Sequence, residues 1–474
     1  MFDRLPAEIF LQVIHDLDPE SRISLTQVCH HAHATLTPHL CTIYRTRVID
    51  LGEIKQGQVL DIRSRITNRQ TLKFVEELVI QSSVSWINGR DRDCLLHECS
   101  HVATLGRELI PLFRGLKRNA LVSFSYDSFF FLPRRRNPFD NHRWQIHTCV
   151  PQSILGPRGY LRRHQRSIQT LHLTGFSCGS NADPSRRPSL SRFHSIRHFS
   201  WSLHTINQCI ATRELFSSRA VSHGLEELTL RGSSLDRELR GWKELQKLWS
   251  WMQARNVFAF KVLQLQPNEN RDRIVFPALR KLALYNVGFW YAVRDLVAAL
   301  NMHNLRSLKL WSYQCSDILW SIAELAAEYN NSTNGTIPLT CLDITLRASS
   351  GDQDTQSFER FFAVSPNLRD VYIQLDAFDQ SSFKPHLRAI FTPERQRNMR
   401  RFIYQRRLQV EGDVCGAWDE TDAPMVWDEE VRRFFAKSQM THVGICDHLP
   451  TLVCTPPTDS VSCLPVSTTT MRQS

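Results

Sequence analysis

The chain has 474 residues, a formal net charge of +11 and the composition of an ordinary globular protein, with 42% hydrophobic and 22% charged residues. No apolar run approaches the ~20 residues of a membrane-spanning helix, and charged residues interrupt the apolar positions near the N-terminus. These features exclude a membrane span and a secretory signal. We therefore expect a protein of the cytoplasm, the nucleus or both, with no membrane partner, whose 13 cysteines are reduced thiols.

The first fifty residues predict three short helices. Pro6, Pro19 and Pro38 each suit the first position of a helix, where the missing N–H costs nothing. Asp18 and Thr37 precede two of these prolines as capping residues. Three helices of this length bury too little apolar surface for a core of their own. We therefore expect the rest of the chain, or a partner, to cover their apolar faces.

Three short motifs in this segment resemble an F-box, the module that docks a protein onto the Skp-family adaptor of a cullin–RING ubiquitin ligase. They are Leu5-Pro6-x-Glu8-Ile9, Ile14-x-x-Leu17-Asp18 and Leu25-x-x-Val28-Cys29. Residues 30–33, His-His-Ala-His, depart from the family pattern, in which a basic residue and often a tryptophan are usual. The alternative is an N-terminal helical cap that packs on the following domain. The resemblance implies an F-box over residues 1–50 whose adaptor-binding residues are Leu5, Pro6, Ile9, Ile14, Leu17, Leu25 and Val28.

One short pattern returns through the body of the chain: an apolar residue, two variable residues, an apolar residue, one variable residue and an apolar residue. The last two apolar positions alternate as in a strand with one buried face, and helical segments lie between the copies. A strand followed by a helix, repeated every few tens of residues, is typical of a leucine-rich-repeat solenoid. The copies begin at Val75, Leu121, Ile168, Ile196, Leu225, Phe260, Leu279, Leu305, Leu339, Leu368 and Met399.

The predicted fold is therefore α/β: a small three-helix F-box followed by an irregular leucine-rich-repeat solenoid, with a parallel sheet and outer helices, over residues 51–410. This pairing resembles the F-box/leucine-rich-repeat receptors of the fungal type. We expect an acidic C-terminal cap over residues 411–448 and a disordered tail, dominated by proline, serine and threonine, over residues 449–474. The alternative for the repeat region is a general α/β domain whose strands are similar by coincidence.

Residues that alternate with the buried strand positions point outward on the concave face of such a solenoid. Exposed tyrosine and tryptophan beside lysine and arginine are typical of protein-binding hot spots. For Tyr285 and Trp311, the alternative is that the side chains turn inward over the edge of the sheet. The predicted target-binding residues are His172, Glu227, Arg231, Lys281, Tyr285, Lys309, Trp311 and Tyr372.

A basic chain, with a pI of about 9.1, is also typical of nucleic-acid-binding proteins. Much of the excess charge is carried by arginines near residues 129–165, a proline-interrupted stretch that we predict to be a long basic insertion in the solenoid. A charge run in a loop is usually a solvated face, and we find no nucleic-acid-binding motif. We therefore predict no nucleic-acid partner.

One sequence motif has the spacing of a metal site. His97-Glu98-Cys99-Ser100-His101 matches H-E-x-x-H, in which two histidines bind zinc and the glutamate acts as a general base, and it lies in the predicted helix 91–116. Catalytic zinc needs a third protein ligand, and none follows at a known spacing. We therefore predict no metal, no cofactor and no active site, and a zinc hydrolase is the enzyme alternative.

The sequence thus predicts a non-catalytic substrate receptor of a ubiquitin ligase. The F-box holds the Skp-family adaptor, and through it the cullin–RING ligase, while the repeats hold a target protein close to the ubiquitin-charged enzyme. The alternative in another class is a leucine-rich-repeat scaffold that binds partners without ubiquitin transfer. Sequence alone does not separate the two hypotheses.

Overall fold

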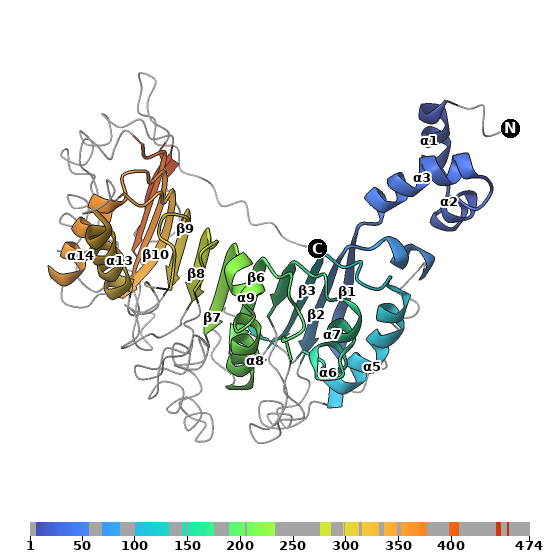
Figure 1. The fold of residues 1–474 in the computed structure, drawn as a ribbon, viewed down its shortest axis with the longest axis horizontal. Coiled ribbons are helices and arrows are strands. Elements are labelled where there is room, and N and C mark those ends of the chain that lie inside the picture. The colour runs from blue at the N-terminus through green and yellow to red at the C-terminus, as the bar shows by residue number, and fades with distance from the viewer. Residues whose placement is uncertain are drawn as a thin grey trace, which may run out of the picture. The chain divides into compact units, whose positions relative to one another are not determined.

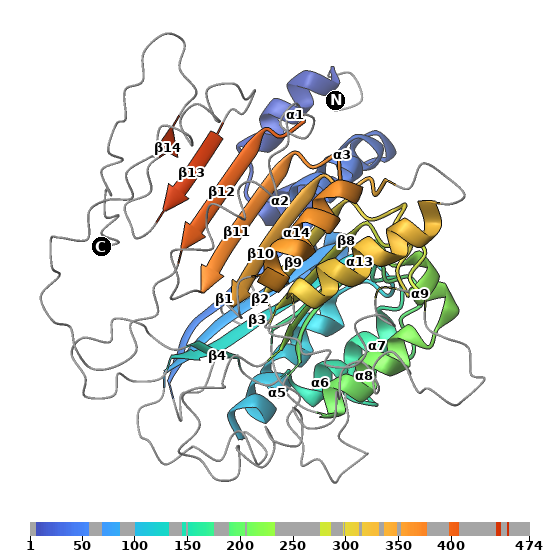
Figure 2. The ribbon, with the colours of Figure 1, turned by 90° about the vertical axis from the view of Figure 1, so that its left-hand side faces the viewer.

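The computed structural model shows an α/β protein whose chain divides into two compact units, Met1–Leu225 and Glu226–Ser474 (Figure 1). Each unit contains a parallel β-sheet with helices against one face, and we call the opposite face the open face (Figures 1 and 2). The structure describes residues 6–55, 69–85, 100–131, 145–147, 150–174, 189–203, 206–232, 275–285, 297, 299–311, 315–330, 336–347, 352–376, 398–406, 442–446 and 453–454.

The sheet of the first unit is parallel except at one short strand. β1 pairs with β2, β2 with β3, β3 with β5 and β5 with β6 in parallel, whereas β4 pairs with β3 in antiparallel orientation. Parallel neighbours require crossover connections, which the helices of this unit supply. The strands are β1 (Thr46–Lys55), β2 (Glu77–Ser85), β3 (Ser123–Phe131), β4 (Gln145–His147), β5 (Thr170–Leu173) and β6 (His198–Leu203).

The helices of the first unit form two groups. The first three precede the sheet and form a module, residues 6–44, that we call the helical module. The others lie between or after the strands. The helices are α1 (Ala7–His15), α2 (Pro19–Leu25), α3 (His30–Ile43), the 3-10 helix η2 (Arg69–Phe74), α5 (Ser100–Gly115), α6 (Gln152–Leu155), α7 (Tyr160–His164), α8 (Ile206–Phe216) and α9 (Arg219–Gly224).

The second unit repeats the same architecture. Its strands follow one another in parallel from β7 to β8, and on through β9, β10, β11 and β12 to β13, with β14 antiparallel at the end. The elements are β7 (Glu227–Gly232), β8 (Lys281–Tyr285), β9 (Ser307–Trp311), α13 (Cys315–Asn330), β10 (Cys341–Arg347), α14 (Asp352–Val364), β11 (Asp370–Asp376), β12 (Arg401–Arg406), β13 (His442–Cys446) and β14 (Val453–Cys454).

The repeating pattern of apolar residues forms a strand wherever the structure describes it. In β9, Leu308 and Leu310 are fully buried, whereas Lys309 between them is half-buried on the open face. The first apolar residue of this copy, Leu305, is buried just before the strand. The strand predictions are confirmed in this way for every described copy, and the copy that begins at Phe260 lies outside the described residues.

The start of the third helix differs from the sequence prediction. Pro38 was expected to open this helix after Thr37, but α3 begins at His30 and contains Pro38. Cys29 caps it, because its Sγ accepts a hydrogen bond from the Ala32 backbone N–H at 3.4 Å. The predicted cap at the second helix is confirmed, since Asp18 accepts the Ser21 backbone N–H at 3.0 Å.

Three predicted segment boundaries also change. β1 begins at Thr46 and pairs with β2, so the sheet starts before residue 50 although β1 lacks the repeat pattern. The second half of the predicted basic insertion is not a long loop, because it contains β4, α6 and α7. Apolar residues between its arginines, such as Ile154 and Leu161, are buried and hold these helices against the unit. Val453–Cys454 pair with β13 inside the segment expected to be disordered, and the rest of that tail lies outside the described residues.

Candidate protein-binding surfaces

The open face of the second unit is organised in rows, because parallel pairing places equivalent residues of neighbouring strands side by side. The row nearest the strand starts contains two ion pairs. Lys281 Nζ on β8 lies 2.5 Å from Glu227 Oε1 on β7, and Arg401 Nε on β12 lies 2.8 Å from Asp370 Oδ1 on β11. All four side chains are at least a third exposed, so we attribute little stability to these pairs.

The next two rows meet at Asp343 on β10. Its Oδ2 lies 3.2 Å from Lys309 Nζ on the neighbouring strand, and its Oδ1 accepts a hydrogen bond from Trp311 Nε1 at 3.1 Å. The Asp343 side chain is only 16% exposed, against 41% for Lys309. One carboxylate therefore orients both a lysine and a tryptophan on this face.

Aromatic contacts extend this group to β7 and β8. The rings of Tyr285 and Trp311 meet edge to face, with centroids 5.1 Å apart and an interplanar angle of 80°. The guanidinium of Arg231 lies over the Tyr285 ring at 5.0 Å. We call Arg231, Tyr285, Lys309, Trp311 and Asp343 the aromatic cluster. Trp311 is 38% exposed, so its side chain faces outward, whereas Tyr285 is half-buried beneath its neighbours.

The charge state of Lys309 is set by these neighbours. Burial by itself lowers the pKa of this ammonium group, but the hydrogen bond and the negative charge of Asp343 outweigh it. Tyr285 and Cys341 add smaller favourable interactions, and the pKa of Lys309 is raised above its usual value. Lys309 therefore stays charged throughout the physiological pH range.

The aromatic cluster has the composition of a protein-binding hot spot. Tyrosine, tryptophan and arginine are the residues enriched at protein-binding hot spots, where a rigid aromatic surface is combined with fixed charges. Within the described residues no three histidine, cysteine or acidic side chains are placed to hold a metal ion. His97 and Glu98 of the H-E-x-x-H motif lie outside the described residues, and α5 begins at Ser100.

Seven of the eight predicted target-binding residues lie on the open face of the second unit. Tyr372 joins the others there, because it is the register partner of Asp343 on β11. His172 lies on β5 in the first unit, between Ser125 and Ser200 in register, and is not part of the aromatic cluster. Sequence reasoning missed Asp343 as a site residue, although it occupies the same alternating position in its copy as Lys309 does.

The helical module forms a second candidate surface. Its core consists of Ile14, Ala32 and Leu36, with Leu11, Leu25 and Cys29 packed against it. Among the predicted adaptor-binding residues, Pro6, Ile9 and Val28 are exposed, and Leu17 and Leu25 are half-buried. Ile14 is fully buried, so it holds the helices together from inside. Leu5 lies outside the described residues.

Exposed apolar side chains are concentrated on this module. Ile9 is 45% exposed and Val13 46%, one turn apart on α1, and Val28 is 60% exposed after α2. Ile43 near the end of α3 is 41% exposed. Of the six large apolar residues that are exposed in the described parts of the chain, these four lie within the module. Val13 was not among the predicted adaptor-binding residues.

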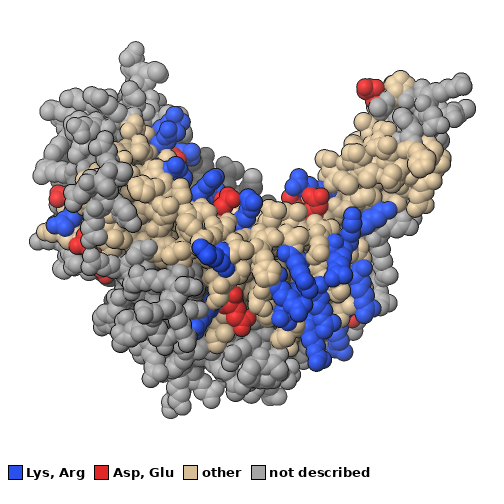
Figure 3. Space-filling view, viewed as in Figure 1, with Lys and Arg blue, Asp and Glu red and all other residues tan. Residues whose placement is uncertain are grey.

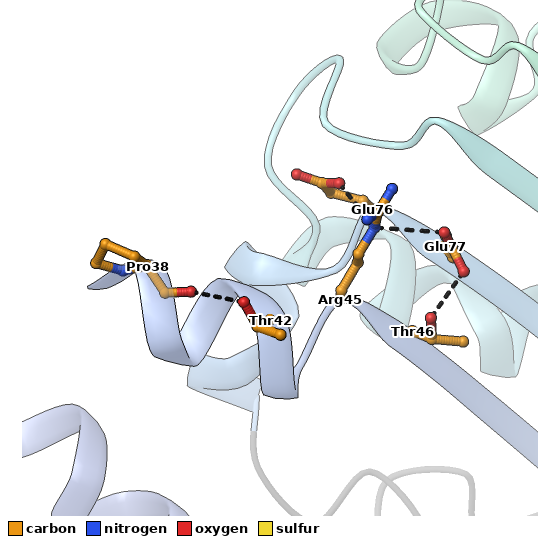
Figure 4. Close-up of polar contacts among 6 residues, drawn as sticks. All are labelled: Pro38, Thr42, Arg45, Thr46, Glu76 and Glu77. Atoms are coloured by element: carbon orange, nitrogen blue, oxygen red, sulfur yellow. Dashed lines mark hydrogen bonds and ion pairs between the residues drawn. The ribbon is translucent and has the colours of Figure 1, made fainter. Parts of the chain in front are cut away.

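Polar contacts tie the module to the sheet that follows it (Figure 4). Arg45 Nε, in the link between α3 and β1, lies 3.2 Å from Glu76 Oε2 and 3.3 Å from Glu77 Oε1. The Arg45 carbonyl also accepts the backbone N–H groups of both glutamates at 2.9 Å, and Thr46 Oγ1 donates to Glu77 Oε2 at 2.7 Å. The last helix of the module therefore enters β1 through a fixed joint.

Comparison with known proteins identifies no relative: no protein-family model matches the chain, and no curated protein matches its sequence. No helix in the described parts of the chain is both long enough and apolar enough to span a membrane.

Proposed function

We propose that the chain is a non-catalytic substrate receptor of a cullin–RING ubiquitin ligase. In this proposal the helical module is an F-box that binds a Skp-family adaptor, and the open face of the second unit binds the target protein. The observation that carries the proposal is that α1 has apolar side chains both in the module core and on an exposed side.

Two sides of α1 are apolar, and only one of them is covered by the chain. Leu11 and Ile14 pack in the module core, whereas Ile9 and Val13 are nearly half exposed on another side of the same helix. A helix that is apolar around most of its circumference is normally buried on all sides. An adaptor helix or loop packed on Ile9 and Val13 supplies that missing cover.

We also propose that the strand–helix repeats form a leucine-rich-repeat solenoid. The repeated apolar pattern coincides with parallel strands, and each leucine pair faces the helices while the residues between them face outward. In such a solenoid every repeat packs on its neighbours, and the outward residues vary freely. The aromatic cluster is then a target-binding site made from β7 to β10.

Mechanistically, the chain acts by holding two partners and supplies no reacting group. The adaptor on the helical module connects to the ligase, and the target on the repeats is held near the ubiquitin-charged enzyme, which raises the effective concentration of its lysines. The backbone hydrogen bonds from Glu76 and Glu77 to the Arg45 carbonyl limit the freedom between the module and the sheet of the first unit.

A matched pair of variants tests adaptor binding. Val13→Asp places a charge on the proposed adaptor surface, and Val48→Asp makes the same change on β1, where the valine is 53% exposed. When each full chain is co-expressed with the adaptor, we expect Val13→Asp to weaken recovery by about thirtyfold, the scale of a single hot-spot residue, and Val48→Asp to leave it unchanged. Equal recovery of adaptor with the native chain, Val13→Asp and Val48→Asp would rule out docking through α1.

Recovery of cullin, and the lifetime of captured proteins, distinguish the ligase receptor from a leucine-rich-repeat scaffold. We expect cullin to be recovered with the native chain and to be lost together with the adaptor in Val13→Asp. The lifetime of proteins captured by the chain should lengthen in cells that carry Val13→Asp but not in cells that carry Val48→Asp. A scaffold predicts unchanged lifetimes in both.

A further inference from the structure

The helical face of the first unit carries a dense group of cations. Figure 3 shows blue side chains gathered over α5–α7 with little red among them. Six of the eight are exposed arginines and one is an exposed lysine, and the half-buried Arg162 completes the group. We call this group the basic helical surface; it consists of Arg114, Lys117, Arg118, Arg158, Arg162, Arg163, Arg166 and Arg192.

The fold holds two parts of this surface together. Asn119, which follows Arg118, adopts a left-handed conformation with φ of 56°, and its Oδ1 accepts the Arg166 backbone N–H at 2.9 Å. The fully buried Gln165 donates from Nε2 to the Lys117 carbonyl at 2.8 Å and accepts the Leu121 backbone N–H at 3.1 Å. The turn after α5 is therefore fixed to the end of α7, and the cations of both segments keep their spacing.

Tyr160 places Arg114 beside the same group. Its ring packs between Phe113 on α5 and His164 on α7, with centroid distances of 5.3 and 4.5 Å. Burial raises the pKa of the Tyr160 hydroxyl, and the positive charge of Arg114 opposes this rise. Arg114 is therefore close enough to Tyr160 to act on it electrostatically.

Crowding of like charges is strongest at Arg162. Burial and the charges of Arg192, Arg163 and Arg166 lower its pKa, and Glu214 opposes them only in part. Its Nη1 donates to the Pro157 carbonyl, but its buried Nε has no hydrogen-bond partner among the described residues. Such crowding is unfavourable in the free protein, and a bound anion relieves it.

Helix-end stabilisation explains only part of the surface. Arg114 lies in the last turn of α5, and Arg162 and Arg163 lie in the last turn of α7, where cations offset the negative end of the helix dipole. Arg158, Arg166 and Arg192 lie outside these last turns.

The composition of the surface selects among anionic partners. The six exposed large apolar residues of the described chain lie elsewhere, so the surface lacks the apolar anchor that stable membrane attachment requires. It exposes no aromatic platform for the bases of single-stranded nucleic acid. The helices α6 and α7 have four and five residues, too few to enter a DNA groove, and the longer α5 contributes to the surface only Arg114 in its last turn. A flexible chain of carboxylates fits a compact group of guanidinium ions, which bind carboxylates in pairs of parallel hydrogen bonds.

We propose that the basic helical surface binds an extended, acidic protein segment rich in aspartate and glutamate. This binding goes beyond adaptor docking and does not depend on it. The surface lies on the helical face of the first unit, so it is distinct from the aromatic cluster on the open face of the second.

The test uses the purified full chain and a fluorescent peptide of alternating glutamate and serine, with a glutamine–serine peptide as the ligand control. The variant is Arg163→Gln/Arg166→Gln; both side chains are exposed and make no hydrogen bond or ion pair within the described residues. The control is Arg280→Gln/Arg369→Gln, which makes the same charge change at two exposed arginines of the second unit. Thermal unfolding checks that both variants fold.

We expect the acidic peptide to bind saturably and the glutamine peptide not to bind. Loss of two exposed ion pairs should weaken binding about fivefold in Arg163→Gln/Arg166→Gln and leave it unchanged in the control variant. Equal weakening in both variants overturns the proposal, because it shows a general effect of net charge. Tighter, Arg163- and Arg166-dependent binding of duplex DNA, or of vesicles containing phosphatidylserine, overturns it in favour of another partner class.

Discussion

The helices of the two units carry opposite charge although they cover sheets of the same kind. In the first unit, α5 to α9 contain six arginines and the carboxylates Glu108 and Glu214. In the second unit, α13 and α14 each contain three acidic residues, and Arg360 is their one basic residue. The parallel pairing and the buried leucines are alike, so packing does not dictate this difference. Surface charge is therefore available for the choice of partners.

The open faces differ as well. The middle row of the first unit holds Ser125, His172 and Ser200, whereas the corresponding row of the second unit holds Lys309, Asp343 and Tyr372. Small hydroxyl side chains offer little area to a partner, whereas the aromatic cluster offers rings and fixed charges. One architecture therefore displays two different chemistries, and this difference is the reason for proposing target binding on the second unit.

The largest change in the free energy of unfolding is expected from substitutions in the leucine cores, which are alike in the two units. Leu171 on β5 and Leu308 on β9 are both fully buried at equivalent strand positions. Leu171→Ala and Leu308→Ala should each lower the free energy of unfolding of their own unit by about 2–5 kcal/mol, because each leaves a cavity. Hydrogen exchange of the strands in denaturant, read separately for each unit, measures both losses. A loss below about 1 kcal/mol in one unit alone would break the claim that the interiors are equivalent.

A smaller change in the free energy of unfolding should distinguish the open face of the second unit from that of the first. Asp343→Asn should lower the free energy of unfolding by about 1–2 kcal/mol, because Lys309 loses its counter-ion and the half-buried contacts of Trp311 are disturbed. Among the described residues, Asp127 in the first unit accepts a hydrogen bond from the neutral hydroxyl of Thr174 alone, at 2.9 Å. Asp127→Asn should therefore lower the free energy of unfolding by less than about 0.5 kcal/mol. Chemical denaturation of both variants supplies the comparison, and equal costs would contradict it.

A smaller, pH-dependent effect follows from Lys309. Its pKa is raised in the folded chain, so its ion pair with Asp343 contributes fully below the unfolded value of about 10.4 and is lost as the pH rises through the higher folded value. The stability difference between the native chain and Lys309→Met should therefore persist at neutral pH and shrink in strong alkali. A difference that grows with rising pH would show that the pKa is lowered instead.

The smallest effect concerns the basic helical surface. Because Arg163 and Arg166 crowd Arg162 and lie exposed, Arg163→Gln/Arg166→Gln should change the free energy of unfolding by no more than about 0.5 kcal/mol, with relief of repulsion favouring a gain. Thermal unfolding at low salt measures this. A loss above about 1 kcal/mol would show that these arginines support the fold.

The repeated strands could be predicted because leucines at fixed spacing must alternate between two faces, so Lys309 and Trp311 were assigned to the open face correctly. β1 could not be predicted, since it lacks the full pattern and is recruited by pairing with β2. β13 was missed although Met440, Val443 and Ile445 carry the pattern, because the acidic stretch before it was interpreted as a cap that ends the repeats. The start of α3 was missed because Cys29 is a rare capping residue while Thr37-Pro38 is a common helix start.

Contacts between residues far apart in the sequence could not be predicted either. The link from Trp311 and Lys309 to Asp343 depends on the register of β9 and β10, which a single sequence does not reveal. In the same way, the arginines between residues 158 and 166 were expected in a loop, because nothing in the sequence indicates that Asn119 and Gln165 join them to the end of α5.

Adaptor binding through the exposed apolar side chains of the helical module is the step on which the proposed function depends. Calorimetric titration of the purified adaptor into the purified full chain tests it most directly. We predict saturable binding of one adaptor per chain with a negative heat-capacity change, since the interface buries the exposed apolar side chains of α1. Absence of binding, or binding that Val13→Asp leaves unchanged, would show that α1 is not an adaptor-docking surface.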